Sequence, residues 1–232
     1  EHLFHHIILD DQDNNLMIED DSLSTVARKS IAGILDKAKA LTAFGNTIPT
    51  SYLRLVPHQE APTNIFWGDT NRSALVRIPL GWILKTEMIK DANPFEIADV
   101  PYIPGKQTAE FRVPDGSADI YHLLAGMVMA MQHGIEMENG LELSEQLKIE
   151  ENIFANEKLA EHLKHLPTSC VESADELEKE IEFFSNDNIF PVGTLERFIK
   201  ILRSYDDKNL SEKLYNKHDE ISKLVNKFIH YA

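Results

Sequence analysis

The stretch Thr108-Ala109-Glu110-Phe111-Arg112-Val113 alternates apolar and polar side chains, which is typical of a β-strand with one buried face. Because successive side chains of a strand point to opposite faces, Thr108, Glu110 and Arg112 are expected to share one face. A carboxylate on that face can ligate a hard cation, while a guanidinium two residues away holds an anion. The alternative is an ordinary salt bridge, either across strands or on the same face.

Two further strands are expected on the N-terminal side of this stretch. Ile65-Phe66-Trp67 is typical of one strand, and the alternation over 74–78 predicts the second. Eight of the ten prolines fall within 45–116. Residues 80–105 lack a clear pattern over a long span, and they are expected to form an excursion or flap.

Helices are expected on both sides of the strand region. Apolar residues at helical spacing predict a helix over about 24–43, with Ser22 or Ser24 as its N-terminal cap. A second helix is expected to start at Ser117-Ala118-Asp119. Four more are expected over about 141–165, 174–185, 193–205 and 209–230. The helix over 174–185 is expected to begin with a capping box at Ser173.

The sequence therefore predicts an α+β fold in three parts, 1–44, 45–116 and 117–232. The expected architecture is a partial, curved, mostly antiparallel sheet with helices packed on it and a helical C-terminal region. Partner strands missing from such a sheet are expected to leave an exposed edge or an apolar patch.

Composition excludes several classes of protein. The 232 residues carry a formal net charge of −15, and a nucleic-acid or anionic-membrane binder needs a surplus of Lys and Arg instead. The single cysteine, Cys170, excludes an internal disulfide framework and any zinc site with two thiolates, and it suits a reducing compartment. No apolar run is long enough to span a membrane, and the first residues do not form a signal peptide. A cytoplasmic location is therefore expected.

Four of the seven arginines lie in the strand region: Arg54, Arg72, Arg77 and Arg112. Arginine recognises planar carboxylates and phosphates because its fork donates two parallel hydrogen bonds and stays charged. An acidic protein that gathers its few arginines there is expected to bind an anionic ligand. Arg72 follows Asn71 and is expected in a turn. Scattered surface ion pairs are the alternative.

Two other features suggest site residues. Glu60 lies between Pro57 and Pro62, and a carboxylate on such a stiffened loop can act as a base or bind a cation. The alternative is a solvated loop acid. The N-terminal residues His2, His5 and His6 are candidate metal ligands, although the first residues of a chain are usually poorly ordered.

Several motifs then occur in a fixed order: Thr50-Ser51-Tyr52-Leu53-Arg54-Leu55-Val56-Pro57, Glu60-Ala61-Pro62, Asn71-Arg72-Ser73-Ala74, Arg77-Ile78-Pro79 and Glu110-Phe111-Arg112-Val113-Pro114-Asp115. In their order and spacing they closely resemble the catalytic domain of glutamine synthetase. The resemblance spans nearly all of the chain and is strongest to the branch found in Bacteroides-type bacteria. Linked motifs in order are far more specific than any one motif.

The resemblance implies a ligase that joins ammonia to glutamate. ATP phosphorylates the γ-carboxylate of glutamate, and ammonia then displaces the phosphate. Matched to the motifs of the family, Arg54 and Arg112 would bind the glutamate carboxylates. Glu60 would bind and deprotonate ammonium as a catalytic residue.

The phosphate and metal roles follow from the same resemblance. Arg72, as a second catalytic residue, would stabilise the transferring phosphate together with Arg77, and Lys106 would contact ATP. Glu110 would ligate Mg²⁺ or Mn²⁺. His2 would be the remnant of the metal-binding histidine loop, although His5 or His6 could equally be that remnant.

The sequence also departs from the family. Thr108 stands where many members carry an arginine, and Phe154 lacks the hydroxyl that adenylylated members modify. The resemblance implies that residue 1 corresponds to a position after the family's N-terminal β-grasp domain and several of its metal-binding glutamates. Because the family's site forms between subunits, in rings of twelve, the complete protein is expected to be a homo-oligomer and the isolated chain to be inactive. A ligase of glutamate and another amine, or a non-catalytic fragment, are the alternatives.

Overall fold

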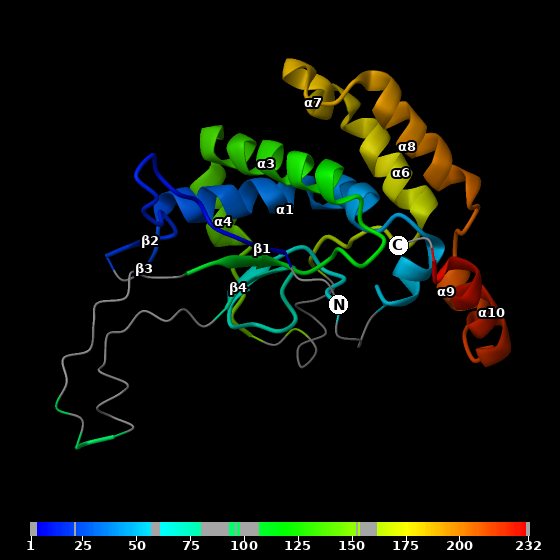
Figure 1. Cartoon of the computed structure of the whole chain (residues 1–232), viewed down its shortest axis with the longest axis horizontal. Coiled ribbons are helices and arrows are strands. Elements are labelled where there is room, and N and C mark those ends of the chain that lie inside the picture. Colours follow the sequence, from blue (N-terminus) through cyan, green and yellow to red (C-terminus); the bar gives the residue numbers. More distant parts are fainter. Residues whose placement is uncertain are drawn as a thin grey trace.

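The computed structural model describes residues 4–20, 22–56, 61–79, 93–95, 97, 107–151, 153 and 162–230. Within them, helices and a small open sheet pack into one body, in which α1 (Thr25–Gly45) and α3 (Ile120–Glu136) lie over the sheet (Figure 1). None of the described helices has the length and hydropathy that a membrane crossing requires. The mixed helix and sheet content confirms the α+β prediction.

The main sheet has the strand order β1-β6-β5-β4. Its strands are β1 (Phe4–His6), β6 (Ala109–Phe111), β5 (Val76–Ile78) and β4 (Trp67–Asp69). β6 pairs antiparallel with both β1 and β5, whereas β4 pairs parallel with β5. A separate two-stranded hairpin joins β2 (Ile18–Glu19) and β3 (Ser22–Leu23). The mostly antiparallel, partial sheet that the sequence predicts is therefore present.

The two outer edges of the sheet differ. On β4, the Trp67 N–H donates to the Leu147 carbonyl at 3.0 Å, and the Ile149 N–H donates to the Trp67 carbonyl at 2.9 Å. On β1, no other strand of the described chain pairs with the outer edge. This edge matches the expectation that a partial sheet leaves a strand without a partner.

The helices α1 and α3 cross at very close range. Ser24 caps α1, since its Oγ accepts the Ala27 N–H at 3.0 Å, which decides between the two candidate serines. At the crossing, a Cβ added to Gly33 would lie 1.9 Å from the Ala130 carbonyl oxygen, and one added to Gly134 would lie 2.2 Å from the Lys29 carbonyl oxygen. The two backbones can approach this closely only because neither glycine has a side chain.

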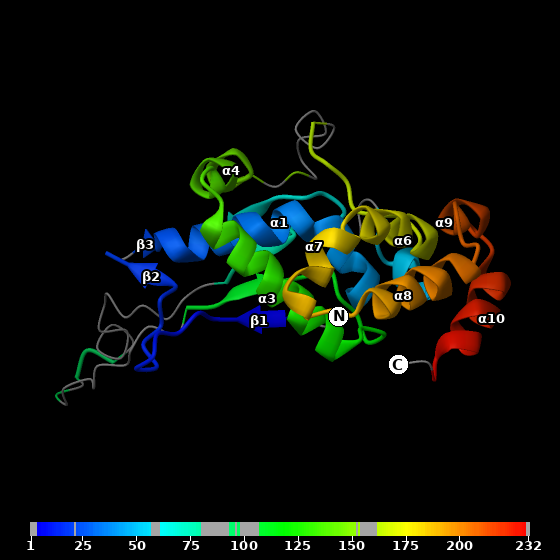
Figure 2. The ribbon, with the colours of Figure 1, turned by 90° about the horizontal axis from the view of Figure 1, so that it is seen from above.

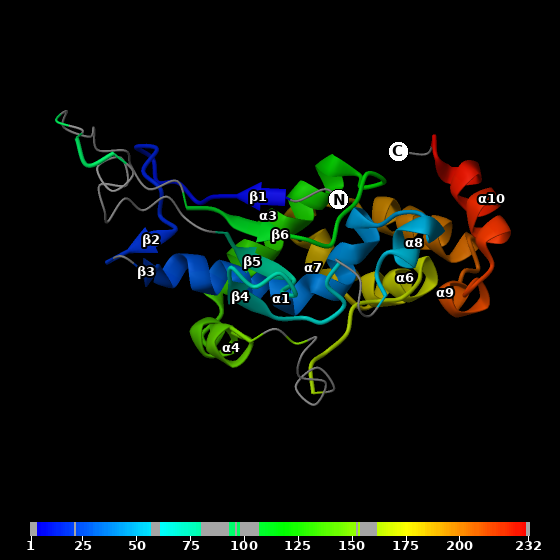
Figure 3. The same cartoon turned by 90° about the horizontal axis from the view of Figure 1, so that it is seen from below.

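The C-terminal region is helical, as predicted. Its first helix lies beside the N-terminal half of α1, and the later helices lie beside and beyond the other end of α1 (Figures 2 and 3). These elements are α4 (Gly140–Gln146), α6 (Cys170–Lys179), α7 (Ile181–Ser185), η3 (Asn186–Asn188), α8 (Val192–Ser204), α9 (Leu210–Lys213) and α10 (His218–Phe228). A further 3₁₀ helix, η1 (Pro49–Leu53), precedes the strand region.

Three of the predicted helices are wrong in extent. The helix expected over 174–185 is instead α6 and α7, which meet at Glu180. The helix expected over 141–165 ends at Gln146, because Leu147 and Ile149 instead supply hydrogen bonds to the edge of β4. The helix expected over 209–230 is split into α9 and α10, and Asn216 between them has a positive φ of 61°. Tertiary partners and a left-handed residue outweigh helical periodicity at these points.

The predicted cap of α6 is also wrong. Ser169, not Ser173, caps the helix, because its Oγ accepts the Glu172 N–H at 3.1 Å. The Glu172 carboxylate in turn accepts the Thr168 N–H at 2.8 Å, one residue before the cap, so this variant of a capping box lies four residues earlier than the expected one. Ser173 is buried and donates its hydroxyl to the Cys170 carbonyl at 2.9 Å.

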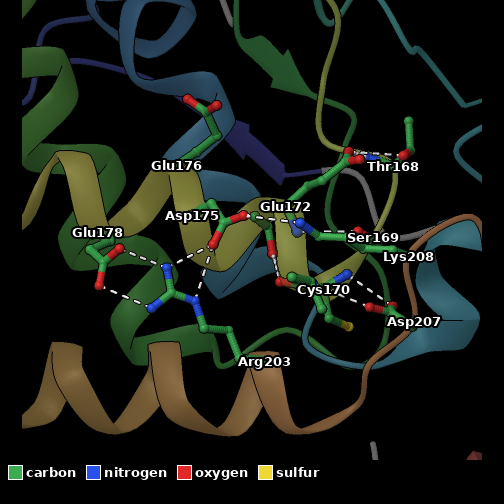
Figure 4. A network of polar contacts seen from close by, with 12 residues as sticks. Thr168, Ser169, Cys170, Glu172, Asp175, Glu176, Glu178, Arg203, Asp207 and Lys208 are labelled. Atoms are coloured by element: carbon green, nitrogen blue, oxygen red, sulfur yellow. Dashed lines mark hydrogen bonds and ion pairs between the residues drawn. The ribbon is translucent and has the colours of Figure 1, made fainter.

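A network of polar contacts fastens α6 to α8 (Figure 4). Asp207, in the loop after α8, accepts the Cys170 N–H at 2.9 Å. Its carboxylate therefore satisfies a backbone N–H at the start of α6 that has no acceptor within the helix. Further along, Arg203 contacts Asp175 at 2.7 Å and Glu178 at 2.6 Å. The two helices are therefore joined at both ends of α6 by charge-assisted hydrogen bonds.

Cys170 is expected to resist thiol reagents in the folded protein. Its side chain is fully buried, and burial together with the neighbouring Asp207 raises the pKa of the thiol well above its ordinary range. Since the thiolate is the reactive form, a colorimetric disulfide reagent should give no reaction in native buffer and one thiol per chain in denaturant. Rapid stoichiometric reaction without denaturant would contradict this placement of Cys170.

Candidate functional site

The centre of the candidate site is an ion pair between neighbouring strands. Arg77 of β5 and Glu110 of β6 are register partners, and both oxygens of the carboxylate contact the guanidinium. The Arg77 Nε lies 2.5 Å from Glu110 Oε2, and its terminal nitrogen lies 3.1 Å from Oε1. The Glu110 side chain is 0% exposed and that of Arg77 is 23% exposed. The cross-strand salt bridge considered from the sequence as an alternative is therefore present, with Arg77 as the partner of Glu110.

His5 of β1 joins this pair from the other side of β6. It is the register partner of Glu110, and its Nε2 lies 3.7 Å from Glu110 Oε1. Its Nδ1 lies 3.2 Å from the Thr108 hydroxyl, so Thr108 and Glu110 share a face as predicted. His6 belongs to the opposite face, and burial lowers its pKa to about 4. The structure thus favours His5 over His6 as the neighbour of the carboxylate.

Arg112 holds the turn that carries Arg72. The side chain of Arg112 is buried, and its guanidinium donates to the backbone carbonyls of Arg72 and Ala74, the latter at 3.2 Å. The Arg112 N–H also donates to the Leu75 carbonyl at 3.1 Å, which extends the pairing of β6 with the residues before β5. A buried guanidinium with backbone partners has a fixed plane, as recognition of a carboxylate requires.

Arg72 lies in a turn, as predicted, and is exposed. Asn71 builds that turn: its Oδ1 accepts the Ser73 N–H at 3.0 Å and the Ser73 hydroxyl at 2.7 Å. The Asn71 amide also donates to the carbonyls of Ile149 and Glu151 at 3.0 and 2.9 Å. The Arg72 backbone is therefore held from both sides while its guanidinium faces solvent.

Arg54 follows η1 and reaches the chain just after Arg112. Its guanidinium donates to the Val113 carbonyl and, at 3.4 Å, to the Pro114 carbonyl. Arg54 therefore contacts the two residues that follow Arg112, and Arg112 contacts the backbone of Arg72. The structure brings together all four arginines singled out from the sequence around β5, β6 and their connecting turns.

Three expected site residues, Glu60, Lys106 and His2, lie outside the described residues, as do Phe154 and almost all of the expected flap over 80–105. His5 is the residue whose position beside Glu110 the sequence left undecided. The Phe4-His5-His6 run marked the histidines as candidate metal ligands. Only the register of β1 against β6 shows that His5 is the histidine beside Glu110.

The described residues do not by themselves fit a magnesium ion. They contain no group of three or more His, Cys, Asp or Glu side chains placed to hold a metal. Both oxygens of Glu110 already contact Arg77, and His5 is its only acidic or imidazole neighbour recorded in the described part of the chain. The metal-ligand role of Glu110 therefore stays a prediction.

The Arg77–Glu110 pair is expected to stabilise the sheet. Glu110→Gln keeps the shape of the side chain but removes the charge opposite a mostly buried guanidinium, so the free energy of unfolding should fall by about 2 kcal/mol. Urea unfolding measures this loss. Replacing both residues, with Arg77→Met and Glu110→Leu, should cost less than the sum of the single changes. Additive effects would show that the pair is not coupled.

Comparison with known proteins shows similarity to the family that the sequence motifs resemble. A family model described as "Glutamine synthetase, catalytic domain" matches residues 2–218. The glutamine synthetase of Pyrococcus furiosus is 36% identical over 179 residues, which is 75% of this chain and 35% of that protein. The glutamine synthetase of Mycolicibacterium smegmatis is 33% identical over 181 residues, 78% of this chain and 33% of that protein. The chain therefore spans about a third of the length of these relatives.

Solved structures share the fold. The GmaS/ADP complex in conformation 1 covers 89% of this chain and 42% of its own, with a TM-score of 0.62 at 23% identity. The cryo-EM structure of Plasmodium falciparum glutamine synthetase covers 89% of this chain and 44% of its own, with a TM-score of 0.60 at 24% identity. The partial sheet and its helices are thus part of a larger fold seen in these proteins.

Proposed function

The chain belongs to the glutamine synthetase catalytic-domain family, and from this premise we propose that it supplies part of the site of a glutamate–ammonia ligase. In the proposed reaction ATP phosphorylates the γ-carboxylate of glutamate, and ammonia displaces the phosphate. The observation that supports the proposal is the gathering of four arginines and one buried carboxylate around β5 and β6. We propose that the activity belongs to a protein that includes residues 1–232 as the C-terminal part of its catalytic domain.

Arg54 and Arg112 are proposed to bind the carboxylates of glutamate. Each guanidinium carries five N–H donors, and backbone carbonyls take part of this set. Those backbone contacts fix the plane of the guanidinium before a ligand binds. A fixed plane lowers the entropy lost on binding and favours a bidentate pair with a carboxylate.

Arg72 and Arg77 are proposed to stabilise the charge of the transferring phosphate. Phosphoryl transfer spreads negative charge over three equatorial oxygens, and positioned cations are the main means of catalysis. Within the described part of the chain, the Arg72 side chain has no recorded ion pair or hydrogen bond, so its charge is open to a ligand. Arg77 is held in one orientation by Glu110.

The remaining assignments rest on the resemblance to the family. Glu60 is proposed to bind and deprotonate ammonium, Lys106 to contact ATP, and Glu110 with His2 to ligate Mg²⁺ or Mn²⁺. A bound divalent cation would neutralise phosphate charge in this site. A cytoplasmic homo-oligomer is part of the same proposal, with the dodecamer of the family as the expected form.

Ammonia is the proposed amine because the curated relatives compared above are glutamine synthetases. The fold likeness to GmaS carries no preference for another amine at 23% identity. A non-catalytic fragment remains an outcome that an activity assay can identify.

Phosphate release with ATP, Mg²⁺ and glutamate tests the proposed function. The assay should be run with and without ammonium, on this chain and on a form extended to the length of the relatives. Release that depends on ammonium in the extended form is expected, and an amine that replaces ammonium with higher kcat/KM would select the other ligase. Absence of ammonium-dependent release from both folded forms would overturn the proposal.

A further inference from the structure

A cavity lies between α8 and the loop that leads into α3. Its volume is about 810 Å³, which is within the range of cavities that bind small molecules. Residues 116–119 and His122 form one wall, and α8 forms the other. The Arg77–Glu110 pair and Arg72 are not among the residues that line it, so it is distinct from the candidate ligase site.

The α8 wall presents positive charge at the start of the helix. Gly193 and Arg197 are four residues apart, so both face the cavity on one side of the helix. Arg197 is exposed, and its side chain has no recorded ion pair or hydrogen bond with another described residue. Five of the six other arginines contact a carboxylate or a backbone carbonyl. Among the described residues, Arg197 and Arg72 are therefore the two arginines whose guanidinium groups are open to a ligand.

The N-terminus of α8 adds further donors beside Arg197. The helix begins after Pro191, and no side chain of the described residues caps it. The Thr194 N–H donates to the Pro191 carbonyl at 2.8 Å, whereas the N–H groups of Val192 and Gly193 donate to no other described residue. These two N–H groups lie at the positive end of the helix dipole. The Thr194 hydroxyl lines the cavity at the same turn. A guanidinium, free N–H groups and a hydroxyl thus converge on one place, which suits a single anionic group.

Next to these donors the cavity is lined by apolar and aromatic side chains. Phe198 and Ile201 line it one turn further along α8, and the His122 ring closes it from α3. The ring centroids of His122 and Phe198 lie 4.9 Å apart at 64°, so their edges and faces form a continuous aromatic surface. This surface suits a planar hydrophobic group.

Asp119 sets the orientation of a ligand. Its carboxylate lies on the opposite wall, 2.7 Å from His122 Nδ1, and it accepts the His122 N–H at 3.2 Å as the cap of α3. This negative charge repels an anionic head from the α3 wall. An anion therefore finds its favourable place only at the α8 wall, with its apolar body against Phe198 and His122.

We propose that this cavity binds a small molecule with one anionic head, a carboxylate or a phosphate, and a flat apolar body. The head lies between Arg197 and the first turn of α8, and the body lies on the aromatic surface. This site is independent of the proposed ligase reaction, so its test does not require turnover.

Ligand-observed NMR titrations of the full chain test the proposal with three probes. These are 1-naphthylacetate, 1-naphthyl phosphate and the neutral 1-naphthylacetamide. We expect at least one anion to bind roughly tenfold more tightly than the amide, since a charge-assisted contact contributes about this factor. Comparison of the two anions distinguishes a carboxylate ligand from a phosphate ligand.

Three variants assign the binding to this cavity. Arg197→Gln should weaken the anion roughly tenfold and leave the amide unchanged. Gly193→Leu should block all three probes without disturbing the fold, because a Cβ at Gly193 meets no atom within 4 Å. Lys200→Gln removes the same charge from an exposed position of α8 outside the cavity, and it should leave binding unchanged.

Several results would overturn the proposal. Equal affinity for the amide and both anions would show an apolar surface without an anion site. Unchanged anion affinity in Arg197→Gln, or in a folded Gly193→Leu, would place any binding elsewhere. Circular dichroism and thermal melting establish that each variant is folded, so a loss of binding can be read as a loss of the site.

Discussion

Arg72→Ala is expected to lower ammonium-dependent turnover by roughly 10³-fold in whichever form of the protein shows that turnover. The side chain is exposed on a turn that Asn71 and Arg112 hold in place, so it can meet the charge that develops on a transferring phosphate. In the proposed role, Arg72 supplies a cation that is needed mainly in the transition state, and the substitution removes it. The loss should therefore appear in kcat, with a smaller change in the KM for glutamate.

Two matched variants separate catalysis from structure. Asn71→Ala leaves the guanidinium present but removes four hydrogen bonds that shape its turn, so it should lower kcat less and reduce thermal stability more. Lys200→Gln on α8 removes one positive charge far along the chain and should leave turnover unchanged. A wild-type kcat in Arg72→Ala, with ammonium dependence intact, would contradict the phosphate role proposed for Arg72.

Gly33→Ala is expected to destabilise the protein by about 3 kcal/mol or more, among the largest effects of any single methyl addition in this fold. The added Cβ would lie 1.9 Å from the Ala130 carbonyl oxygen and 2.7 Å from the Gly134 nitrogen. Both contacts are with the backbone of α3, which cannot rotate away as a side chain can. The two helices must therefore separate, and the apolar core that they share opens.

The control for this prediction is Gly193→Ala, which adds the same methyl group to another helical glycine. No atom lies within 4 Å of that Cβ, so the change should be neutral or stabilise by about 0.5 kcal/mol. Gly134→Ala should match Gly33→Ala, because its Cβ would lie 2.2 Å from the Lys29 carbonyl oxygen. Chemical denaturation measures all three. A Gly33→Ala protein as stable as the wild type would show that α1 and α3 do not cross at this distance.

The spacing of apolar residues was sufficient to predict the helices and strands whose ends depend on residues nearby in the sequence. The helix expected over 24–43 is α1, and the alternating stretch 108–113 contains β6. In both cases the pattern of apolar residues matches the face that is buried, and the cap of α1 is a serine directly before it. The cap at Ser169 and the end of α4 were missed, because contacts with Asp207 and β4 decide them.

In the candidate site, too, the sequence predicts some features and tertiary contacts decide the others. The residue types were present in the sequence: arginines and a glutamate on strands and turns, in motifs that resemble one family. The sequence by itself thus determined the family, the α+β fold class and the residue types of the candidate site, whereas β1 and the β2–β3 hairpin were not predicted from it. Which nitrogen meets which oxygen depends on the register of β1, β6 and β5.

Only the tertiary structure placed His5 and Arg77 on Glu110, and Arg112 on the backbone of Arg72. It also created the cavity between α3 and α8 from residues about 75 positions apart, such as His122 and Arg197. The physical reason is that hydrogen bonds and packing between distant segments follow from strand register and helix crossing. Neither is encoded in the spacing of residues along one segment.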